Sequence, residues 1–198
     1  FMIIFAFSRY FLPYKGASNG KAIAIPKGIV TLFGVLAVIS FLGEGGMMDW
    51  SGVFLTEAKG VDLSLAGVAY AVFSAAMLIG RLIGDKVVQK LGEQRVVIFG
   101  GIVASIGYII SIVFDNFFMM QFGFILLGFG AANIVPVVFT LLGRQKEMPI
   151  NSAVTAVTSM GYLGVMFGPA LLGFIAHGIG IVAVFCILAG MFILQAIV

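Results

Sequence analysis

Residues 28–56 of this chain read GIVTLFGVLAVISFLGEGGMMDWSGVFLT, a long apolar run that holds two acids, Glu44 and Asp49. About 20 residues of helix cross the hydrocarbon core of a bilayer, so this run is long enough to span a membrane. It stays apolar on all sides, whereas the strands of a membrane β-barrel alternate apolar and polar residues over about ten positions. We therefore predict a transmembrane helix here.

Five further apolar runs follow, with short polar segments between them. They are residues 64–84, 95–114, 117–143, 149–176 and 179–198. Of the 198 residues 62% are hydrophobic and only 10% are charged, whereas about 25% of the residues in soluble domains are charged. The sequence thus predicts an all-α membrane protein with six transmembrane helices, and this composition excludes most soluble enzymes.

The basic residues predict the orientation of the chain, because short loops rich in Lys and Arg remain in the cytoplasm. When the ends of the six spans are assigned alternately to two sides, all 11 basic residues except Lys59 fall on one side. We therefore expect a multi-pass protein of the cell (inner or plasma) membrane, with cytoplasmic segments at residues 13–27, 85–94 and 144–148. The basic residues form no stripe that would bind nucleic acid.

Both ends of the chain are apolar. Residues 1–12 are expected to end a preceding transmembrane helix, residues 13–27 to form a linker, and residues 28–198 to form a six-helix domain. The last run stops while it is still apolar, so we expect the sequence to be a fragment. A single cysteine, Cys186, and a single histidine offer no cluster of ligands, so we expect neither a metal nor a cofactor.

Glu44 is the first candidate for a functional residue, because a charge at the centre of a bilayer costs about 2.5 to 3.5 kcal/mol even on the mildest scale. Three neighbouring glycines weaken the helix here and are expected to permit local unwinding. Glu44 is predicted to bind substrate or couple protons; the alternative is a protonated or hydrogen-bonded acid that holds helices together. Asp49 and Trp50 are further candidates, although a Trp near the interface also acts as an anchor.

The fourth run repeats this pattern of small and helix-breaking residues with Asn133 and Pro136 near its middle. Interrupted helices at corresponding positions of two inverted three-helix repeats are typical of the binding site of a transporter. Asn133 is therefore a candidate for contact with a polar solute. A hydrogen bond between helices is the alternative for this side chain.

Hydroxyl groups supply the remaining candidates. Ser159 and Tyr162 lie on one face of the fifth run, together with earlier hydroxyl residues at helical spacing, and Tyr70 and Ser74 form a similar pair in the second. Such a face can line a polar cavity, but Ser and Thr in membrane helices also bond back to their own backbone. The third and sixth runs carry few polar groups and are expected to form a scaffold that faces lipid.

Residues 80–92, GRLIGDKVVQKLG, resemble the cytoplasmic signature of the major facilitator superfamily. The resemblance implies that the six spans are the seventh to twelfth of a twelve-helix fold, and that a missing N-terminal six-helix half is a partner. It also implies a conformational latch formed by Gly80, Arg81, Gly84, Asp85, Lys86, Lys90 and Gly92. The sequence departs from the family pattern at Gln89, where an acid is expected, so Asp85 is the nearest acid to pair with Arg81, Lys86 or Lys90.

A second stretch, residues 164–173, resembles the Gly-rich segment of the fifth and eleventh helices of that superfamily. Its Gly164, Gly168 and Pro169 are expected to pack helices closely, because small residues four positions apart let two helices touch. Residues 43–55 are similar to sugar-permease-like members of the superfamily, including the fucose-permease-like branch.

These resemblances imply a secondary active transporter that moves a small solute, sugar-like or another small organic molecule, by alternating access. Proton coupling through Glu44, as in a symporter, is a further expectation. Multidrug or metabolite efflux by the same fold is one alternative, and a transport-inactive sensor or scaffold is another. A membrane enzyme is not expected, because the sequence holds no dense constellation of catalytic or metal-binding groups.

Overall fold

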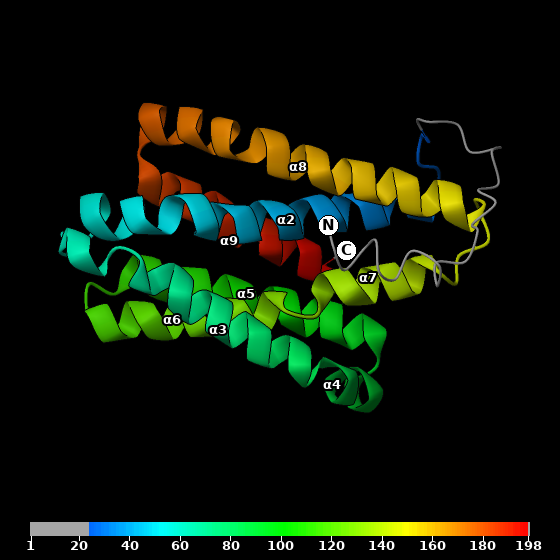
Figure 1. Ribbon diagram of the computed structural model, residues 1–198, viewed down its shortest axis with the longest axis horizontal. Helices are drawn as coiled ribbons and strands as arrows, with labels where there is room; N and C mark the ends of the chain where they lie inside the picture. Colours follow the sequence, from blue (N-terminus) through cyan, green and yellow to red (C-terminus); the bar gives the residue numbers. More distant parts are fainter. Residues whose placement is uncertain (1–23, 198) are drawn as a thin grey trace, which may run out of the picture.

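The structure, a computed structural model, describes residues 24–197 (Figure 1). The predicted helix end at residues 1–12 and the first part of the predicted linker, residues 13–23, lie outside this part of the chain. The described residues form helices and short connections, without a strand. The expected all-α class is therefore confirmed.

Each predicted apolar run is helical. Five segments are long and apolar enough to cross a membrane: Ile29–Ala58, Leu63–Leu82, Glu93–Val113, Phe117–Leu142 and Ile150–Ile179. Their main helices are α2 (Ile29–Val53), α3 (Val68–Leu82), α5 (Glu93–Val113), α6 (Phe117–Ala131), α7 (Ile134–Leu142) and α8 (Ile150–Ile179). The sixth run forms α9 (Ile181–Ile197), which is also apolar but has 17 residues.

The helices pack in a pattern of two inverted repeats. Helix α2 packs along α8, α3 packs along α6, and α5 packs against both α6 and α9. The spans of the first half, α2, α3 and α5, correspond in order to α6–α7, α8 and α9 of the second half. The contact of α2 with α8 then corresponds to the contact of α6 with α3. Figure 1 shows the long helices running roughly side by side, with α4 at the end where α2 and α5 begin. The arrangement is that of half of a twelve-helix fold.

Aromatic side chains fill the centre of the bundle. The rings of Phe54 and Phe185 stack with their centroids 4.1 Å apart, and Tyr108 meets Phe185 edge-on at 5.4 Å. All three side chains are fully buried. Since offset stacked and edge-to-face pairs are the favoured aromatic geometries, this cluster fixes α5 and α9 against the C-terminal end of the Ile29–Ala58 segment.

Most of the segment at residues 85–94, which was expected to be a polar connection between two spans, is helical. Residues Gly84–Leu91 form the short helix α4, which ends at Gly92 with φ +82°. Asp85 in the first turn and Lys90 in the last have the charges that a helix dipole favours at those positions. The half-buried Val87 and Val88 pack against the core, so one face of α4 is held on the bundle.

The two expected helix interruptions have different outcomes. Helix α2 is continuous through Glu44, so the local unwinding expected there is not observed. The glycines instead give α9 room: a side chain at Gly43 would meet the ring of Phe192, and one at Gly46 would meet Leu188. The fourth run does break, between Ala131 and Ile134, where α6 ends and α7 begins.

Short segments complete the end opposite α4. Helix α2 continues as a π-helical turn, η2 (Phe54–Ala58), and a 3₁₀ turn, η3 (Leu63–Leu65), leads into α3. The Asp62 carboxylate caps η3 by accepting a hydrogen bond from the backbone N–H of Ser64 at 2.8 Å. Hydrogen bonding by the Ser64 side chain, and then by its backbone N–H, lowers the pKa of Asp62 because it favours the charged form of the carboxyl.

Candidate functional site

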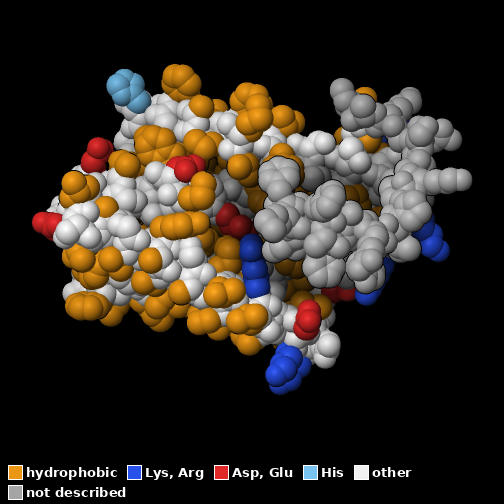
Figure 2. Space-filling view, viewed as in Figure 1, with side chains coloured by type: hydrophobic (Ala, Val, Ile, Leu, Met, Phe, Trp, Pro, Cys, Tyr) orange, Lys and Arg blue, Asp and Glu red, His pale blue; other side chains and the backbone are white. Residues whose placement is uncertain are grey.

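A cavity of about 390 Å³ lies between α2 and α3, with one side chain contributed by α8. Four polar residues line it among those that the structure describes: Glu44 on α2, and Tyr70, Ser74 and Arg81 on α3. The rest of the lining is Phe41, Gly45, Met48, Phe73, Met77, Leu78 and Val165. On the face drawn in Figure 2, hydrophobic side chains dominate and charged ones are few. The cavity therefore combines an apolar wall with a small group of polar side chains.

Glu44 and Arg81 form an ion pair in this cavity. Nη2 of Arg81 donates a hydrogen bond to Oε2 of Glu44 at 3.3 Å. The Glu44 side chain is 20% exposed and that of Arg81 is 48% exposed, so the cation faces the open space more than the acid does. The other carboxylate oxygen of Glu44, Oε1, is buried and has no hydrogen-bond partner among the described residues.

Arg81 also contacts the break between α6 and α7. Pro136 has no N–H, so it cannot make the helical hydrogen bond to the carbonyl oxygen of Ala132. Nε of Arg81 donates to that oxygen instead, at 3.4 Å. In the opposite direction, Nδ2 of Asn133 donates to the carbonyl oxygen of Gly80 at 3.0 Å. Two hydrogen bonds thus join the end of α3 to the break, and one of them uses the cavity arginine.

Asn133 is therefore not in the cavity that holds Glu44. It lines a different and more apolar cavity of about 220 Å³, which is bounded by α3, α4, α5 and α6. The structure places this amide in an interhelical hydrogen bond, the alternative that the sequence left open. Gly84 is close beside it, because a side chain at that position would overlap Asn133.

Tyr108 on α5 contacts the backbone beside Glu44, and this contact was not predicted from the sequence. Its hydroxyl donates a hydrogen bond of 2.9 Å to the carbonyl oxygen of Gly43, the residue before Glu44. The side chain is fully buried. One tyrosine in an apolar run gives no sign that it binds a backbone atom 65 positions earlier, so nothing in the sequence could have identified this contact.

The other predicted residues are dispersed around the cavity or away from it. Tyr70 lines it, as expected. Tyr162 of α8 is exposed and stacks on Phe41 with ring centroids 6.3 Å apart, so it lies at the edge. Asp49 and Ser159 are exposed and do not belong to the cavity lining.

Trp50 packs towards α8 rather than into the cavity. A side chain at Gly173 would come within 3.1 Å of Cζ2 of the indole ring. The indole Nε1 is buried and has no hydrogen-bond partner among residues 24–197. The tryptophan is thus held between two helices of the bundle.

Comparison with known proteins shows the family of the chain. The model of the Major Facilitator Superfamily matches residues 33–198. The chain belongs to this superfamily. Its members are transporters and not enzymes, so the predicted membership of the superfamily is confirmed, whereas the similarity to its fucose-permease-like branch stays a prediction.

Curated relatives support the same assignment. An uncharacterized MFS-type transporter of Yersinia pestis is 46% identical over 159 residues, which cover 80% of this chain and 41% of the relative. The uncharacterized transporter y4wD of Sinorhizobium fredii is 31% identical over 81% of this chain and 42% of its own length. Membrane protein MosC of Rhizobium meliloti is 29% identical over 76% of this chain and 37% of its own length. The chain thus spans about two fifths of the relatives that it matches.

The residues that resemble the superfamily signature divide into two groups. Asp85, Lys86 and Lys90 are exposed on α4, and none of the three ion pairs found between described residues includes them. Arg81, which was expected to join this latch, pairs with Glu44 in the cavity. Gly80 packs against Ala132 at the break between α6 and α7.

The second superfamily segment lies along α2. A side chain at Gly164 would come within 3.4 Å of Val38, and one at Gly168 would come within 2.7 Å of Leu42. Pro169 lies within α8, which is continuous at that position. These contacts show the close approach of α8 to α2 that the small residues were expected to allow.

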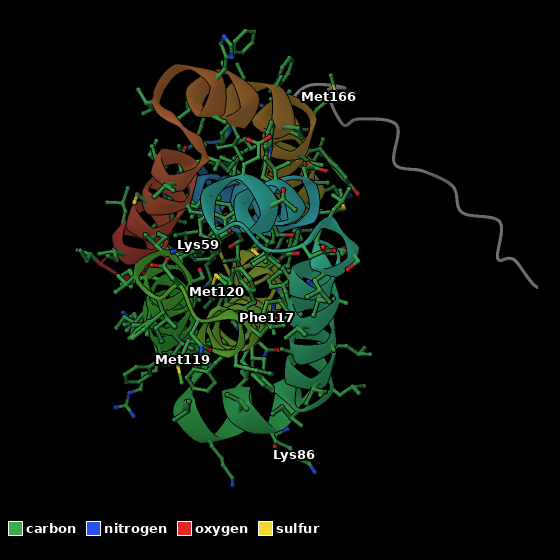
Figure 3. The ribbon with its side chains drawn as sticks, turned by 90° about the vertical axis from the view of Figure 1, so that its left-hand side faces the viewer. Lys59, Lys86, Phe117, Met119, Met120 and Met166 are labelled. Carbon is green, nitrogen blue, oxygen red and sulfur yellow. The ribbon has the colours of Figure 1, made fainter. Side chains whose placement is uncertain are left out.

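Polar contacts join the helix ends on both sides of the superfamily fold. At one end, Oε2 of Glu147 accepts a hydrogen bond from the N–H of Ile29 at 2.9 Å, and Arg144 pairs with Glu93 at 2.8 Å. At the other end, Lys59 pairs with Asp115 at 2.6 Å. Figure 3 looks along the bundle from this second end, with Lys59 among the helix ends and Lys86 on α4 at the edge.

Proposed function

We propose that this protein is a secondary active transporter of a small organic solute, and that the cavity containing Glu44 and Arg81 forms one wall of the transport site. The observation that carries this proposal is the ion pair in the cavity, in which Glu44 lies about halfway along the α2 segment and Arg81 lies in the last turn of α3. Charged side chains within membrane spans are rare, and they mark the paths of substrates and ions. The small volume and mixed lining of the cavity suit a small organic molecule.

A second half would form the opposite wall. The half-exposed guanidinium of Arg81 would face lipid if nothing else covered the cavity, and that exposure would be costly in a bilayer. The chain spans 41% of the length of its Yersinia relative, which is consistent with a six-helix half of a larger transporter. Alternating access would then consist of a rocking motion of the two halves around the cavity.

Glu44 is the proposed proton-coupling residue. One of its oxygens is bonded to Arg81, and the other is buried without a partner among the described residues. Protonation would remove the charge of the carboxyl and release the guanidinium, so the ion pair offers a direct link between proton binding and the shape of the cavity. This proposal makes the protein a symporter.

The test is the variant Glu44→Gln, which keeps the size of the side chain but cannot take up a proton. The protein, reconstituted into proteoliposomes, is assayed with radiolabelled sugars, organic anions and hydrophobic cations, with and without a proton gradient. We expect the variant to insert normally and to lose gradient-driven uptake.

The matched control is Glu57→Gln, because Glu57 is exposed in η2 and does not line the cavity. It should transport as the wild type does. Full gradient-driven uptake by Glu44→Gln would overturn the role given to Glu44. Equal losses in both variants would indicate damage to the protein rather than a loss of coupling.

A further inference from the structure

The charges of the cavity indicate the class of solute. Among the described residues, Glu44 and Arg81 are the charged side chains in the lining, and they neutralise each other when paired. When Glu44 is protonated, Arg81 is left with an uncompensated positive charge. A solute with one negative charge would restore neutrality, whereas a neutral or cationic solute would not.

We infer that the transported solute is a small organic monoanion, whose anionic group binds Arg81 while Glu44 carries the co-transported proton. This inference rests on the proposed function. The inference adds a charge balance to the proposed function. The cavity is neutral when the ion pair is formed, and the cavity is neutral again when one anion and one proton are bound. Neutrality in both states suits alternating access, because an uncompensated charge within the membrane is costly.

The geometry of Arg81 suits an anion. Its Nε is directed at Ala132 and its Nη2 at Glu44, and its other N–H donors have no partner in the described part of the chain, so they can bind a ligand. A guanidinium presents its donors in a planar fork that matches a carboxylate or a similar oxyanion. Because Arg81 is 48% exposed and Glu44 only 20% exposed, a solute in the cavity meets the cation first.

Within residues 24–197, the surroundings of Glu44 supply no other charge that would compete with Arg81. From α3 the cavity receives the hydroxyls of Tyr70 and Ser74, and from α8 it receives Val165. The Tyr108 hydroxyl of α5 is already bonded to the carbonyl oxygen of Gly43. The residues of α9 that approach α2 here are apolar: Leu188 and Phe192. Asp49, on α2 itself, is exposed outside the lining.

The apolar part of the lining indicates which groups the rest of the solute carries. Phe41, Phe73, Met48 and Met77 give one side of the cavity an aromatic and thioether surface. Such side chains bind apolar groups, and methionine adapts to irregular shapes. The two hydroxyls add few polar contacts, fewer than a sugar with many hydroxyl groups would need. A compact, partly apolar anion fits this lining better than a sugar does.

The experiment compares three aromatic probes of similar size but different charge: benzenesulfonate, neutral benzenesulfonamide and cationic benzyltrimethylammonium. Binding of the radiolabelled probes to the purified protein is measured at pH 5 and pH 8. We expect benzenesulfonate to bind at least about tenfold more tightly than the other two at pH 5. We expect its affinity to fall by about tenfold or more at pH 8, because one proton is taken up with the anion.

Variants separate the two roles. Glu44→Gln should bind benzenesulfonate tightly at both pH values, because the amide stands in for the protonated acid. Arg81→Gln should weaken binding of the anion by about tenfold or more, and Arg81→Lys should restore part of it because the charge is kept. Glu57→Gln should bind as the wild type does.

The inference is overturned if benzenesulfonamide binds as tightly as benzenesulfonate, if Arg81→Gln binds the anion unchanged, or if the wild type binds no anion. Any of these results would leave the proposed function standing as long as gradient-driven uptake of another solute still requires Glu44. Retention of that uptake in Glu44→Gln would overturn the proposed function itself, so the two failures are distinguishable.

Discussion

At the scale of single residues, a functional role for Glu44 is predicted by the sequence, whereas its pairing with Arg81 could not be predicted. Glu44 is conspicuous because it lies alone in a long apolar run, and the cost of such a charge predicts a function or a partner. Its partner could not be predicted, because Arg81 is 37 positions away and its direction depends on how α3 packs against α2. The nearby Asp85 made a latch contact the more obvious prediction for that arginine.

Tyr108 provides a test at this scale. Replacing Tyr108 with Phe removes the hydrogen bond to Gly43 and leaves a buried carbonyl oxygen without that partner. We expect the free energy of unfolding to fall by about 0.5 to 1.5 kcal/mol. The change is measured by denaturation of the purified protein in detergent micelles.

Tyr162→Phe is the control for this variant, because the Tyr162 side chain is 64% exposed. It should leave stability within about 0.5 kcal/mol of the wild type. Equal stability of Tyr108→Phe and wild type would show that the hydroxyl does not hold α5 to α2.

At the scale of elements, apolarity and length were sufficient to predict the six helical runs. The helix α4 was missed because it is short and carries several charges, and the half-buried valines that hold it on the bundle act only through tertiary contact. The break between α6 and α7 could be predicted from Pro136, which removes a backbone donor. The continuity of α2 could not be predicted, because its glycines leave space for the close packing of α9, and that contact depends on the tertiary fold.

The packing of α5 against α6 gives a prediction for a pair of elements. A Cβ at Gly107 would lie 2.5 Å from the carbonyl oxygen of Gly123 and 2.6 Å from the backbone nitrogen of Leu127. These are backbone atoms and cannot turn aside as a side chain can. We therefore expect Gly107→Ala to lower the free energy of unfolding by about 1 to 3 kcal/mol, as overpacking does in other cores.

Gly190→Ala in α9 is the matched control, because a Cβ there meets nothing within 4 Å. In a helix interior, alanine is favoured over glycine by up to about 1 kcal/mol, so this variant should be neutral or more stable. Both are measured by the same denaturation in detergent. If Gly107→Ala were as stable as Gly190→Ala, the two helices would be less closely packed than the structure shows.

At the scale of the whole molecule, polar contacts hold each end of the bundle together. The segment at residues 144–148 is joined to the start of α2 through Glu147 and to the start of α5 through Arg144. At the opposite end, Lys59 is 6% exposed and binds both Asp115 and the carbonyl oxygen of Ile112. With both ends fixed, we expect these helices to move as one body, so that the change of access takes place at the face of the cavity rather than within the bundle.

The orientation of this body in the membrane is the last prediction, and it follows from the sides on which the basic residues lie. Lys90 on α4 and Glu57 in η2 are both exposed and belong to opposite ends of the bundle. Since basic segments remain in the cytoplasm, we expect Lys90 inside and Glu57 outside. A cysteine is placed at one position at a time, in a protein whose exposed Cys186 has been replaced by Ala. A membrane-impermeant maleimide is then added to intact cells. Glu57→Cys should react at once, and Lys90→Cys only after the cells are permeabilised. The reverse pattern would place α4 outside and refute the orientation, and reaction of both in intact cells would contradict the assignment of the two ends to opposite sides.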